Sequence, residues 1–275
     1  MTPPPVSDPE PRVALGDAQC IEISGEDARA FVQAQFSGDV RELQTMHWQW
    51  NAWLDHKGAV RALMHLADPG NGRLIVLLRG GNAEESCIDL RKYVLRAKVR
   101  IEPVHERFLS IGGPLPLHEI RVEADAIGFG CGGRSAWLEP VCRAGDGERE
   151  REFRLDEIRL GWPRLPPGSD PEFLPPALGL EHLGAVSFDK GCYPGQEIAA
   201  RLHYRGGHKR RLVHVCGSSS SMRPGDVLQT GARDVVLECS PATDGWHALA
   251  VMDESSFNES NGLHDKLRVI DRFDA

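Results

Sequence analysis

Hydrophobic and polar positions alternate most clearly in the first third of the chain. In HWQWNAWL (residues 47–54) tryptophan, alanine and leucine take every second position apart from Trp53, which is strand periodicity. A turn at residues 55–58 and an apolar run over residues 59–66 complete a predicted hairpin. Residues 13–23 and the buried-looking RLIVLL (residues 73–78) predict further strands.

Two helices are predicted, one after residues 13–23 and one after residues 73–78. Ser24 and Asp27 favour a helix start, as a cap and as a negative charge at the positive end of the helix. Apolar residues follow at helical spacing up to residue 36. Residues 84–95 also have one apolar face and predict a second helix.

The middle of the chain has weaker patterns. GFGCGG (residues 128–133) lacks a surrounding βαβ unit, so it predicts a turn between short strands and not a dinucleotide site. Residues 145–151 are expected to form a charged loop. The segment PRLPPGSDPEFLPP (residues 163–176) is too rich in proline for a regular helix or central strand and is expected to run extended.

A different pattern begins near residue 206. Five short strands are predicted, separated by Gly, Ser, Pro and Asn: residues 211–216, 226–230, 235–239, 248–252 and 266–270. Regularly spaced short strands are typical of a small antiparallel barrel or sandwich. We therefore expect a domain boundary near residue 206.

Composition and charge narrow the class of protein. The 275 residues have a formal net charge of −8, with 41% hydrophobic and 26% charged residues, as in ordinary folded proteins. The chain has no run of about 18 apolar residues, so no membrane span is expected. The proline-rich, acidic N-terminus resembles neither a signal peptide nor a transit peptide. A cytoplasmic location is expected. The negative charge argues against a general nucleic-acid binder, but it leaves room for a local anion site.

The seven cysteines are widely spaced and include no CxxC pair, so the common structural zinc and dithiol motifs are absent. Six of them read as small buried hydrophobic residues, which is the usual state of a free cysteine. These six are Cys20, Cys87, Cys131, Cys142, Cys216 and Cys239.

Cys192 differs because of its surroundings, DKGCYPGQEIAARLHYRGGHKRR (residues 189–211). Pro194 and Gly195 predict a turn, and residues 196–202 a helix. Cys192 would then precede a helix N-terminus, where free N–H groups and the partial positive charge favour a thiolate, as does Lys190 nearby. The residues alone leave two interpretations open, a reactive thiol and a structural turn cysteine.

The same stretch is a local positive region in an acidic chain. Between Lys190 and Arg211 it contains six basic residues and one acid, Glu197; the basic residues are Lys190, Arg201, Arg205, Lys209, Arg210 and Arg211. Such a region would suit a small polyanion or an acidic partner surface. A solvated helix face and loop is the alternative interpretation.

KGCYPGQE resembles the KGCYxGQE signature of the YgfZ family, the folate-binding relatives of the glycine cleavage aminomethyltransferase (T-protein). The flanks VSF and ARLHYRG also resemble that family, as does IRLGWPRLPP with its R-x-G-x-P element. FVQAQFSGDV, DHKGAV and KYVLRAKVRI are similar to family segments nearer the start. The resemblance runs over most of residues 13–215.

The resemblance implies a fold and a cofactor. The fold would be α+β and three-lobed, arranged around a central channel as in the T-protein, with a C-terminal antiparallel β-barrel. Tetrahydrofolate would bind in the channel. The chain would then consist of a disordered lead-in (1–11), a composite folate-binding region of two interleaved lobes (12–205) and a small β-barrel (206–275).

The resemblance also implies the site residues. Cys192 would be the essential thiol, and we expect Lys190 to act with it as a catalytic residue; no metal ligand is expected. The residues expected to bind the cofactor are Gly191, Tyr193, Gly195, Gln196, Glu197, Arg201 and Arg159. The tryptophans of the first hairpin, Trp48, Trp50 and Trp53, could form a wall for the pterin or could be core.

Two departures from the family patterns matter. Pro176 and Gly179 stand where relatives usually have glutamine and asparagine, which affects the pocket near the proline-rich segment. The T-protein has an aspartate pair in its hairpin, and this chain has Arg61 and Ala62 there. Without that carboxylate, proton transfer at the folate nitrogen has no obvious agent, so glycine cleavage activity is disfavoured.

The function that the resemblance implies is support of iron–sulfur cluster assembly or repair, including enzymes that modify tRNA. The partners would be folate and iron–sulfur client or assembly proteins, with no direct nucleic-acid binding and no membrane. Two alternatives stay open: a folate-dependent one-carbon transferase with Cys192 as nucleophile, and a client-docking adaptor without catalysis.

Overall fold

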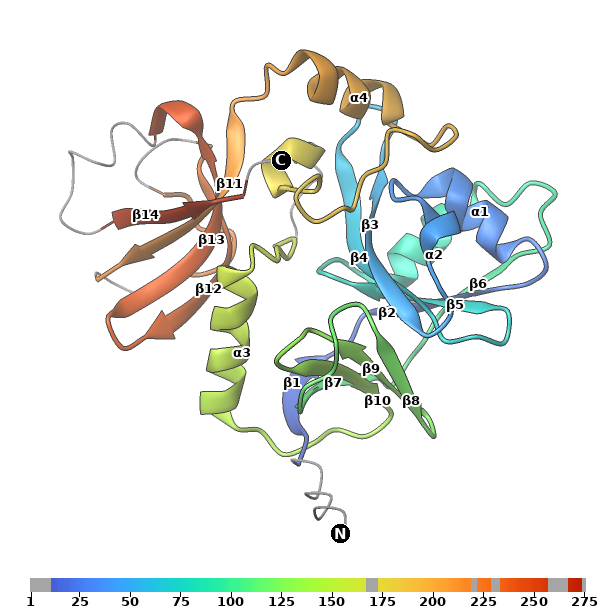
Figure 1. Cartoon of the computed structure of the whole chain (residues 1–275), viewed down its shortest axis with the longest axis horizontal. Helices are drawn as coiled ribbons and strands as arrows, with labels where there is room; N and C mark the ends of the chain where they lie inside the picture. The colour runs from blue at the N-terminus through green and yellow to red at the C-terminus, as the bar shows by residue number, and fades with distance from the viewer. Residues whose placement is uncertain (1–10, 167–172, 219–221, 229–232, 257–266, 274–275) are drawn as a thin grey trace, which may run out of the picture.

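The structure is a computed structural model that describes residues 11–166, 173–218, 222–228, 233–256 and 267–273. Three antiparallel sheets and four α-helices make up the described chain (Figure 1). The first sheet contains the predicted hairpin, in the order β3 (His47–Leu54), β4 (Val60–Asp68), β5 (Arg73–Leu78), β2 (Cys20–Ser24) and β6 (Arg100–Pro103). Alternation along β3 and β4 therefore predicted this part of the fold correctly.

The second sheet comes from the middle of the chain. Its strand order is β1 (Val13–Asp17), β7 (Phe108–Gly112), β10 (Ser135–Glu139), β9 (Ala126–Gly130) and β8 (Ile120–Glu123). The strand predicted over residues 13–23 is thus two strands that belong to different sheets. Within GFGCGG, residues 128–130 end β9 and residues 131–133 lie in the turn to β10, so the predicted turn is confirmed for the second half of the segment.

The third sheet is C-terminal, in the order β12 (Val235–Ala242), β13 (Gly245–Asp253), β11 (Arg210–Gly217) and β14 (Leu267–Arg272). Four predicted strands are confirmed. At residues 226–230 there is a single bridge from Val227 to Val235, and residues 229–230 lie outside the described residues. The described strands form an antiparallel sheet, and closure into a barrel is not seen among them.

The helices are α1 (Ala28–Gln35), α2 (Ala83–Arg91), α3 (Gly147–Arg159) and α4 (Gln196–Arg205), with short 3₁₀ turns η1 (Val40–Glu42) and η2 (Pro175–Leu178). The predicted cap at Ser24 is wrong, because Ser24 ends β2 and Asp27 stands at the N-terminus of α1. The predicted charged loop at residues 145–151 is also wrong. Asp146 accepts hydrogen bonds from the N–H groups of Glu148 and Arg149 and so begins α3.

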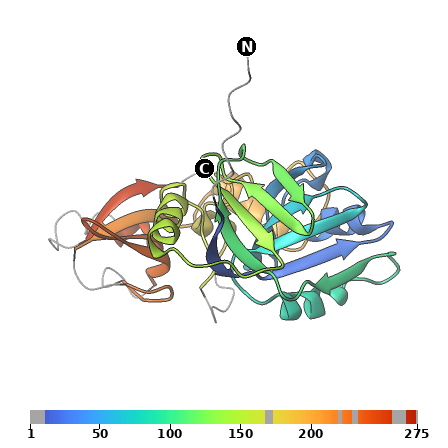
Figure 2. The ribbon, with the colours of Figure 1, turned by 90° about the horizontal axis from the view of Figure 1, so that it is seen from below.

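Helix α3 lies between the C-terminal sheet and the second sheet (Figure 2). It packs against β12 and β13 on one side and against β1 and β7 on the other. One hydrophobic core runs through this junction and includes side chains from all three sheets. Of the predicted lead-in, residues 1–10 lie outside the described residues.

Candidate functional site

The KGCYPGQE segment forms a loop that leads directly into α4. The predicted turn is confirmed, because Gly195 has φ +76° and α4 begins at Gln196. A Cβ atom at Gly195 would lie 2.5 Å from the Asp55 carbonyl oxygen, and one at Gly58 would lie 2.8 Å from Cβ of Ile198. The loop and α4 therefore rest on the β3–β4 turn at a distance that only glycine permits.

Lys190 fastens this loop to the end of α1. Its buried ammonium donates hydrogen bonds to the carbonyl oxygens of Phe36 (2.6 Å) and Gly38 (2.8 Å), and Gln196 Nε2 lies 3.4 Å from the Lys190 carbonyl oxygen. Burial lowers the pKa of Lys190 to about 8, although the nearby Asp39 carboxylate acts in the opposite direction. These contacts support a positioning role, and the catalytic role of Lys190 stays a prediction.

A second set of hydrogen bonds holds the residues before the motif. The Ser187 N–H donates to the Ser37 carbonyl (2.8 Å), and the Ser37 hydroxyl donates to the Ala185 carbonyl (2.7 Å). The Tyr193 hydroxyl donates to the Ser187 carbonyl (3.2 Å), and burial raises the pKa of Tyr193 to about 12. The loop around Cys192 is thus anchored on both sides.

Cys192 itself is exposed, as are its neighbours Gly191, Glu197 and Arg201. An accessible sulfur on an anchored loop can meet a partner molecule without rearrangement of the chain. Among the other six cysteines, Cys142 is exposed and Cys131 and Cys239 are only partly buried, which corrects the expectation that all six are buried.

Arg159 lies apart from the motif, at the C-terminal end of α3, where it pairs with Asp156 at 3.2 Å. It lines a cavity of about 350 Å³ between α3 and the loop after β9. The cavity wall consists of Cys131, Gly133, Arg134, Phe153, Asp156, Glu157, Arg159, Leu160 and Trp162. Of the predicted folate residues, Arg159 therefore lines this cavity. The predicted residues within the KGCYPGQE motif lie elsewhere, in the loop that packs against the β3–β4 turn.

Beside this cavity is a buried ionic cluster that the sequence patterns did not predict. Arg79, after β5, is hydrogen-bonded to Glu157 and to the Trp162 carbonyl (3.1 Å). Arg164 Nη2 lies 3.6 Å from Glu157 Oε2, and its Nε lies 3.4 Å from Glu238 Oε2 on β12. Burial raises the pKa of Glu157, but the charges of Arg79 and Arg164 outweigh it and lower that pKa.

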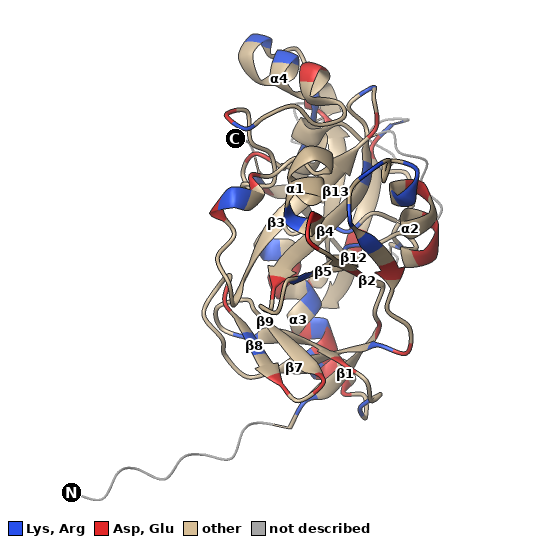
Figure 3. Cartoon of the chain, turned by 90° about the vertical axis from the view of Figure 1, so that its right-hand side faces the viewer, with Lys and Arg blue, Asp and Glu red and all other residues tan. Residues whose placement is uncertain are grey.

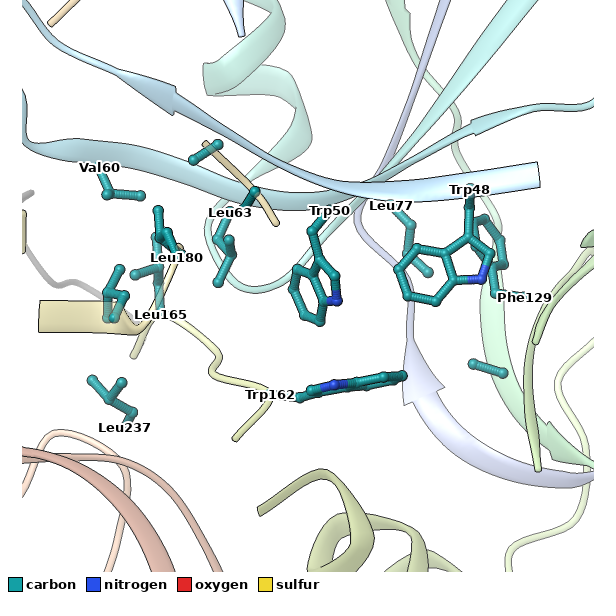
Figure 4. Close-up of a cluster of buried hydrophobic side chains, with 14 of the residues drawn as sticks. Trp48, Trp50, Val60, Leu63, Leu77, Phe129, Trp162, Leu165, Leu180 and Leu237 are labelled. Atoms are coloured by element: carbon teal, nitrogen blue, oxygen red, sulfur yellow. The ribbon is translucent and has the colours of Figure 1, made fainter. Parts of the chain in front are cut away.

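Aromatic rings surround the cluster. Trp48, Trp50 and Trp162 point into the same central space (Figure 4), and the His65 ring centre lies 4.2 Å from that of Trp48. Within the described chain neither His65 nitrogen has a hydrogen-bond partner, and burial lowers the pKa of His65 well below its usual value. All three hairpin tryptophans are core, with Trp53 on the opposite face under α1.

A second cavity, of about 300 Å³, lies between α4, η2 and the C-terminal sheet. Pro176 and Gly179, the two departures from the family pattern, both line it. Gly179 has φ +62° and ends η2, and a Cβ there would lie 3.1 Å from the Phe273 carbonyl oxygen. Glycine at this position therefore allows η2 to approach the C-terminal segment closely.

Two kinds of site are absent from the described residues. No three or more of their His, Cys, Asp and Glu side chains are grouped so that they could hold a metal ion. Among the helices of the described segments, none is both long and apolar enough to cross a membrane.

Comparisons with known proteins agree with this architecture. No family model matches the chain. An uncharacterized protein of Haemophilus influenzae is 30% identical over 210 residues, which cover 73% of this chain and 71% of that protein. The tRNA-modifying protein YgfZ of Escherichia coli O7:K1 is 29% identical over 238 residues, or 76% of this chain and 73% of that protein. The corresponding protein of Vibrio atlanticus is 27% identical over 227 residues, with 76% and 70% covered.

A solved structure supports the relationship at the level of the fold. The glycine cleavage system aminomethyltransferase T of Bartonella henselae matches 89% of this chain and 78% of its own, with a TM-score of 0.63 and 16% identity. The α+β fold is therefore that of an aminomethyltransferase T, and the chain belongs to the YgfZ family.

Proposed function

We propose that this protein binds tetrahydrofolate and serves tRNA modification as a cytoplasmic accessory protein, acting through Cys192 on iron–sulfur proteins. The observation that carries the proposal is the exposed Cys192 on a loop that Lys190 and Tyr193 anchor. The name of the relatives, tRNA-modifying protein, supports the process. The aminomethyltransferase T fold supports the cofactor.

The cavity beside α3 fits a folate by its chemistry. Its volume of about 350 Å³ is in the range of small-molecule sites. Trp162 and Phe153 offer aromatic surface for a flat pterin, and Arg134 and Arg159 offer positive charge for the glutamate carboxylates. Glu157 Oε2 is buried without a hydrogen bond in the described structure, so it could accept one from a pterin N–H group.

In this proposal residues 12–205 hold the folate, and Arg159 is the predicted cofactor residue with direct support from the cavity. Gly191, Gly195, Gln196, Glu197 and Arg201 shape and border the loop around Cys192. Their contact with folate stays a prediction.

Calorimetric titration with tetrahydrofolate tests the cofactor. Saturable binding is expected in the wild type and in Cys192→Ser, because the cavity and the thiol are separate. Trp162→Leu should weaken binding by roughly fivefold, since an aromatic contact is worth about 1 kcal/mol. Trp246→Leu removes another buried tryptophan, on β13, and should leave the affinity unchanged. Absence of binding in the wild type would remove folate from the proposal.

The role of Cys192 is tested in a host that lacks its own relative. Cys192→Ser should fail to restore the modified nucleosides of tRNA, whereas Cys142→Ser, the other exposed cysteine of the described chain, should restore them. Restoration by Cys192→Ala would favour the adaptor alternative. Turnover of a formyl, methylene or aminomethyl folate would favour the one-carbon transferase.

A further inference from the structure

The outer face of α4 is exposed next to the Cys192 loop. Ile198 contacts Gly58 and Ala199 is buried, so the helix turns these residues toward the β3–β4 turn. Arg201, Tyr204 and Arg205, at positions i, i+3 and i+4, lie together on the exposed side of the helix, away from Ala199. Figure 3 shows α4 at the edge of the molecule, with basic residues along it.

Tyr204 is the large apolar group of this face, with 70% of its surface exposed. Its ring centre lies 4.7 Å from that of His203, and the His203 ring stacks on Phe188 at 4.1 Å. Phe188 belongs to the loop that carries Cys192, four residues earlier in the chain. The aromatic series therefore connects the exposed helix face to the loop with the thiol.

The cavity of about 300 Å³ lies on the Ala199 side of α4, because Leu202 and His203 line it at i+3 and i+4 from Ala199, and Glu181 and Glu254 are also part of its wall. His203 Nδ1 lies 2.7 Å from Glu181 Oε2, which fixes the ring at the cavity edge. A protruding tyrosine flanked by arginines has the form of a protein interaction site, where such residues provide most of the binding energy.

The charge of the face is opposite to that of the whole chain. Arg201, Arg205 and Lys209 are exposed, and their side chains form no ion pair with any of the described residues. Glu197 is the one acid between residues 196 and 209, while the chain has a net charge of −8. A positive area of this kind attracts and orients an acidic partner.

We propose that the outer face of α4 forms the docking site for an acidic segment of a partner protein, which brings the partner's reacting group to Cys192. Only the last clause rests on the proposed function. Three exposed cations are few for nucleic-acid binding, which gains affinity from many phosphate contacts, and the net negative charge opposes it. An acidic protein segment is thus the occupant that the charges favour.

Two assays with defined probes test docking, both in a Cys142→Ser background. The first measures by fluorescence anisotropy the binding of a labelled acidic peptide without cysteine. The second measures the release of thiopyridone when Cys192 attacks a pyridyl disulfide on the same peptide extended by one cysteine, forming a protein–peptide disulfide. A matched peptide has glutamine and asparagine in place of every acid, and dithiodipyridine serves as a small neutral reagent.

We expect the acidic peptide to bind, and its disulfide to react at least about tenfold faster than the amide peptide at low salt, a difference that added salt removes. Arg205→Glu should abolish the difference without changing the rate with dithiodipyridine. Arg121→Glu, an equal charge change at an exposed arginine on β8, should retain it. Anisotropy should be unchanged by Cys192→Ser.

Equal rates for the two peptides, or an advantage that survives Arg205→Glu, would overturn the docking site. Arg205-dependent binding of a labelled RNA oligonucleotide, with no binding of the acidic peptide, would also overturn it and assign the face to nucleic acid. A Cys192 that fails to react even with dithiodipyridine would count against the proposed function alone, because peptide binding is measured independently.

Discussion

The ammonium group of Lys190 is buried, and it donates hydrogen bonds to two backbone carbonyl oxygens. The groups of Phe36 and Gly38 lie at the end of α1, where carbonyl oxygens lack partners within the helix. The lowering of the Lys190 pKa to about 8 shows that burial disfavours the charge. The two hydrogen bonds therefore offset the free-energy cost of burying the ammonium charge. They also hold the motif loop against the end of α1.

Lys190→Met should destabilise the protein by about 2 kcal/mol, because it leaves two carbonyls without their donor while removing the cost of the buried charge. Thermal unfolding measures this loss. The loop should also become more mobile, so the rate at which Cys192 reacts with dithiodipyridine should change.

Lys57→Met is the control, since Lys57 is exposed on the adjacent β3–β4 turn and should have little effect on stability. A different result for Lys190→Met would identify Lys190 as an activator of the Cys192 thiol. In that case stability would be nearly unchanged, and the midpoint of the pH–rate profile of Cys192 would move to higher pH.

At the scale of elements, the β3–β4 turn is the base on which the motif is built. The turn meets α4 through Gly58 and the motif loop through Gly195, and both glycines have positive φ. Close approach of these backbones determines where Cys192 emerges. The two glycines are therefore part of the site although they carry no functional group.

Gly195→Ala should lower the free energy of unfolding by about 2 kcal/mol or more, for two reasons. A left-handed backbone conformation costs a residue with a side chain about 1–2 kcal/mol, and the new Cβ atom would lie only 2.5 Å from the Asp55 carbonyl oxygen. Gly184→Ala is a matched control. Gly184 has φ +65°, and a Cβ atom there would have nothing within 4 Å, so the substitution should show the conformational cost alone. Urea unfolding of both variants measures the difference, and equal destabilisation would show that the close approach contributes nothing.

The elements that the sequence predicted are those with one clear periodicity. The β3–β4 hairpin alternates, and α4 follows a Pro-Gly turn, so both were found from local patterns. Helix α3 was missed because the many charged residues within GEREREFRLDEIR hide its few apolar positions. Its signal was the cap, Asp146, directly before the first helical residue.

The motif loop was predicted because its residues are consecutive, whereas the central cluster was not. His65, Arg79, Glu157 and Arg164 come from four separate segments, and only the packing of three sheets brings them together. A local signal existed in two places. His65 and Arg79 each interrupt or end an apolar strand, where a polar residue needs a buried partner.

At the scale of the whole molecule, the central cluster connects parts that would otherwise meet through apolar contacts alone. Arg79 follows β5 of the first sheet, Glu157 lies on α3, and Glu238 lies on β12 of the C-terminal sheet. The cluster lies in the same core as Trp50 and Trp162. Loss of one charged residue of the cluster should therefore weaken the packing of the sheets against one another, and not the stability of a single sheet.

Glu157→Gln should destabilise the protein by about 3–5 kcal/mol, because it keeps the shape of the side chain and leaves the buried Arg79 without its counter-charge. Glu152→Gln on the same helix is the control. Its partner Arg134 lies 3.3 Å away in a solvent-exposed pair, which is worth about 0–1 kcal/mol. Urea unfolding followed by both tryptophan fluorescence and circular dichroism should shift by the same amount for Glu157→Gln, since the cluster joins the sheets. Similar effects of the two substitutions would show that the buried pair contributes no more than a surface one, and separate shifts of the two signals would show that the sheets unfold independently of it.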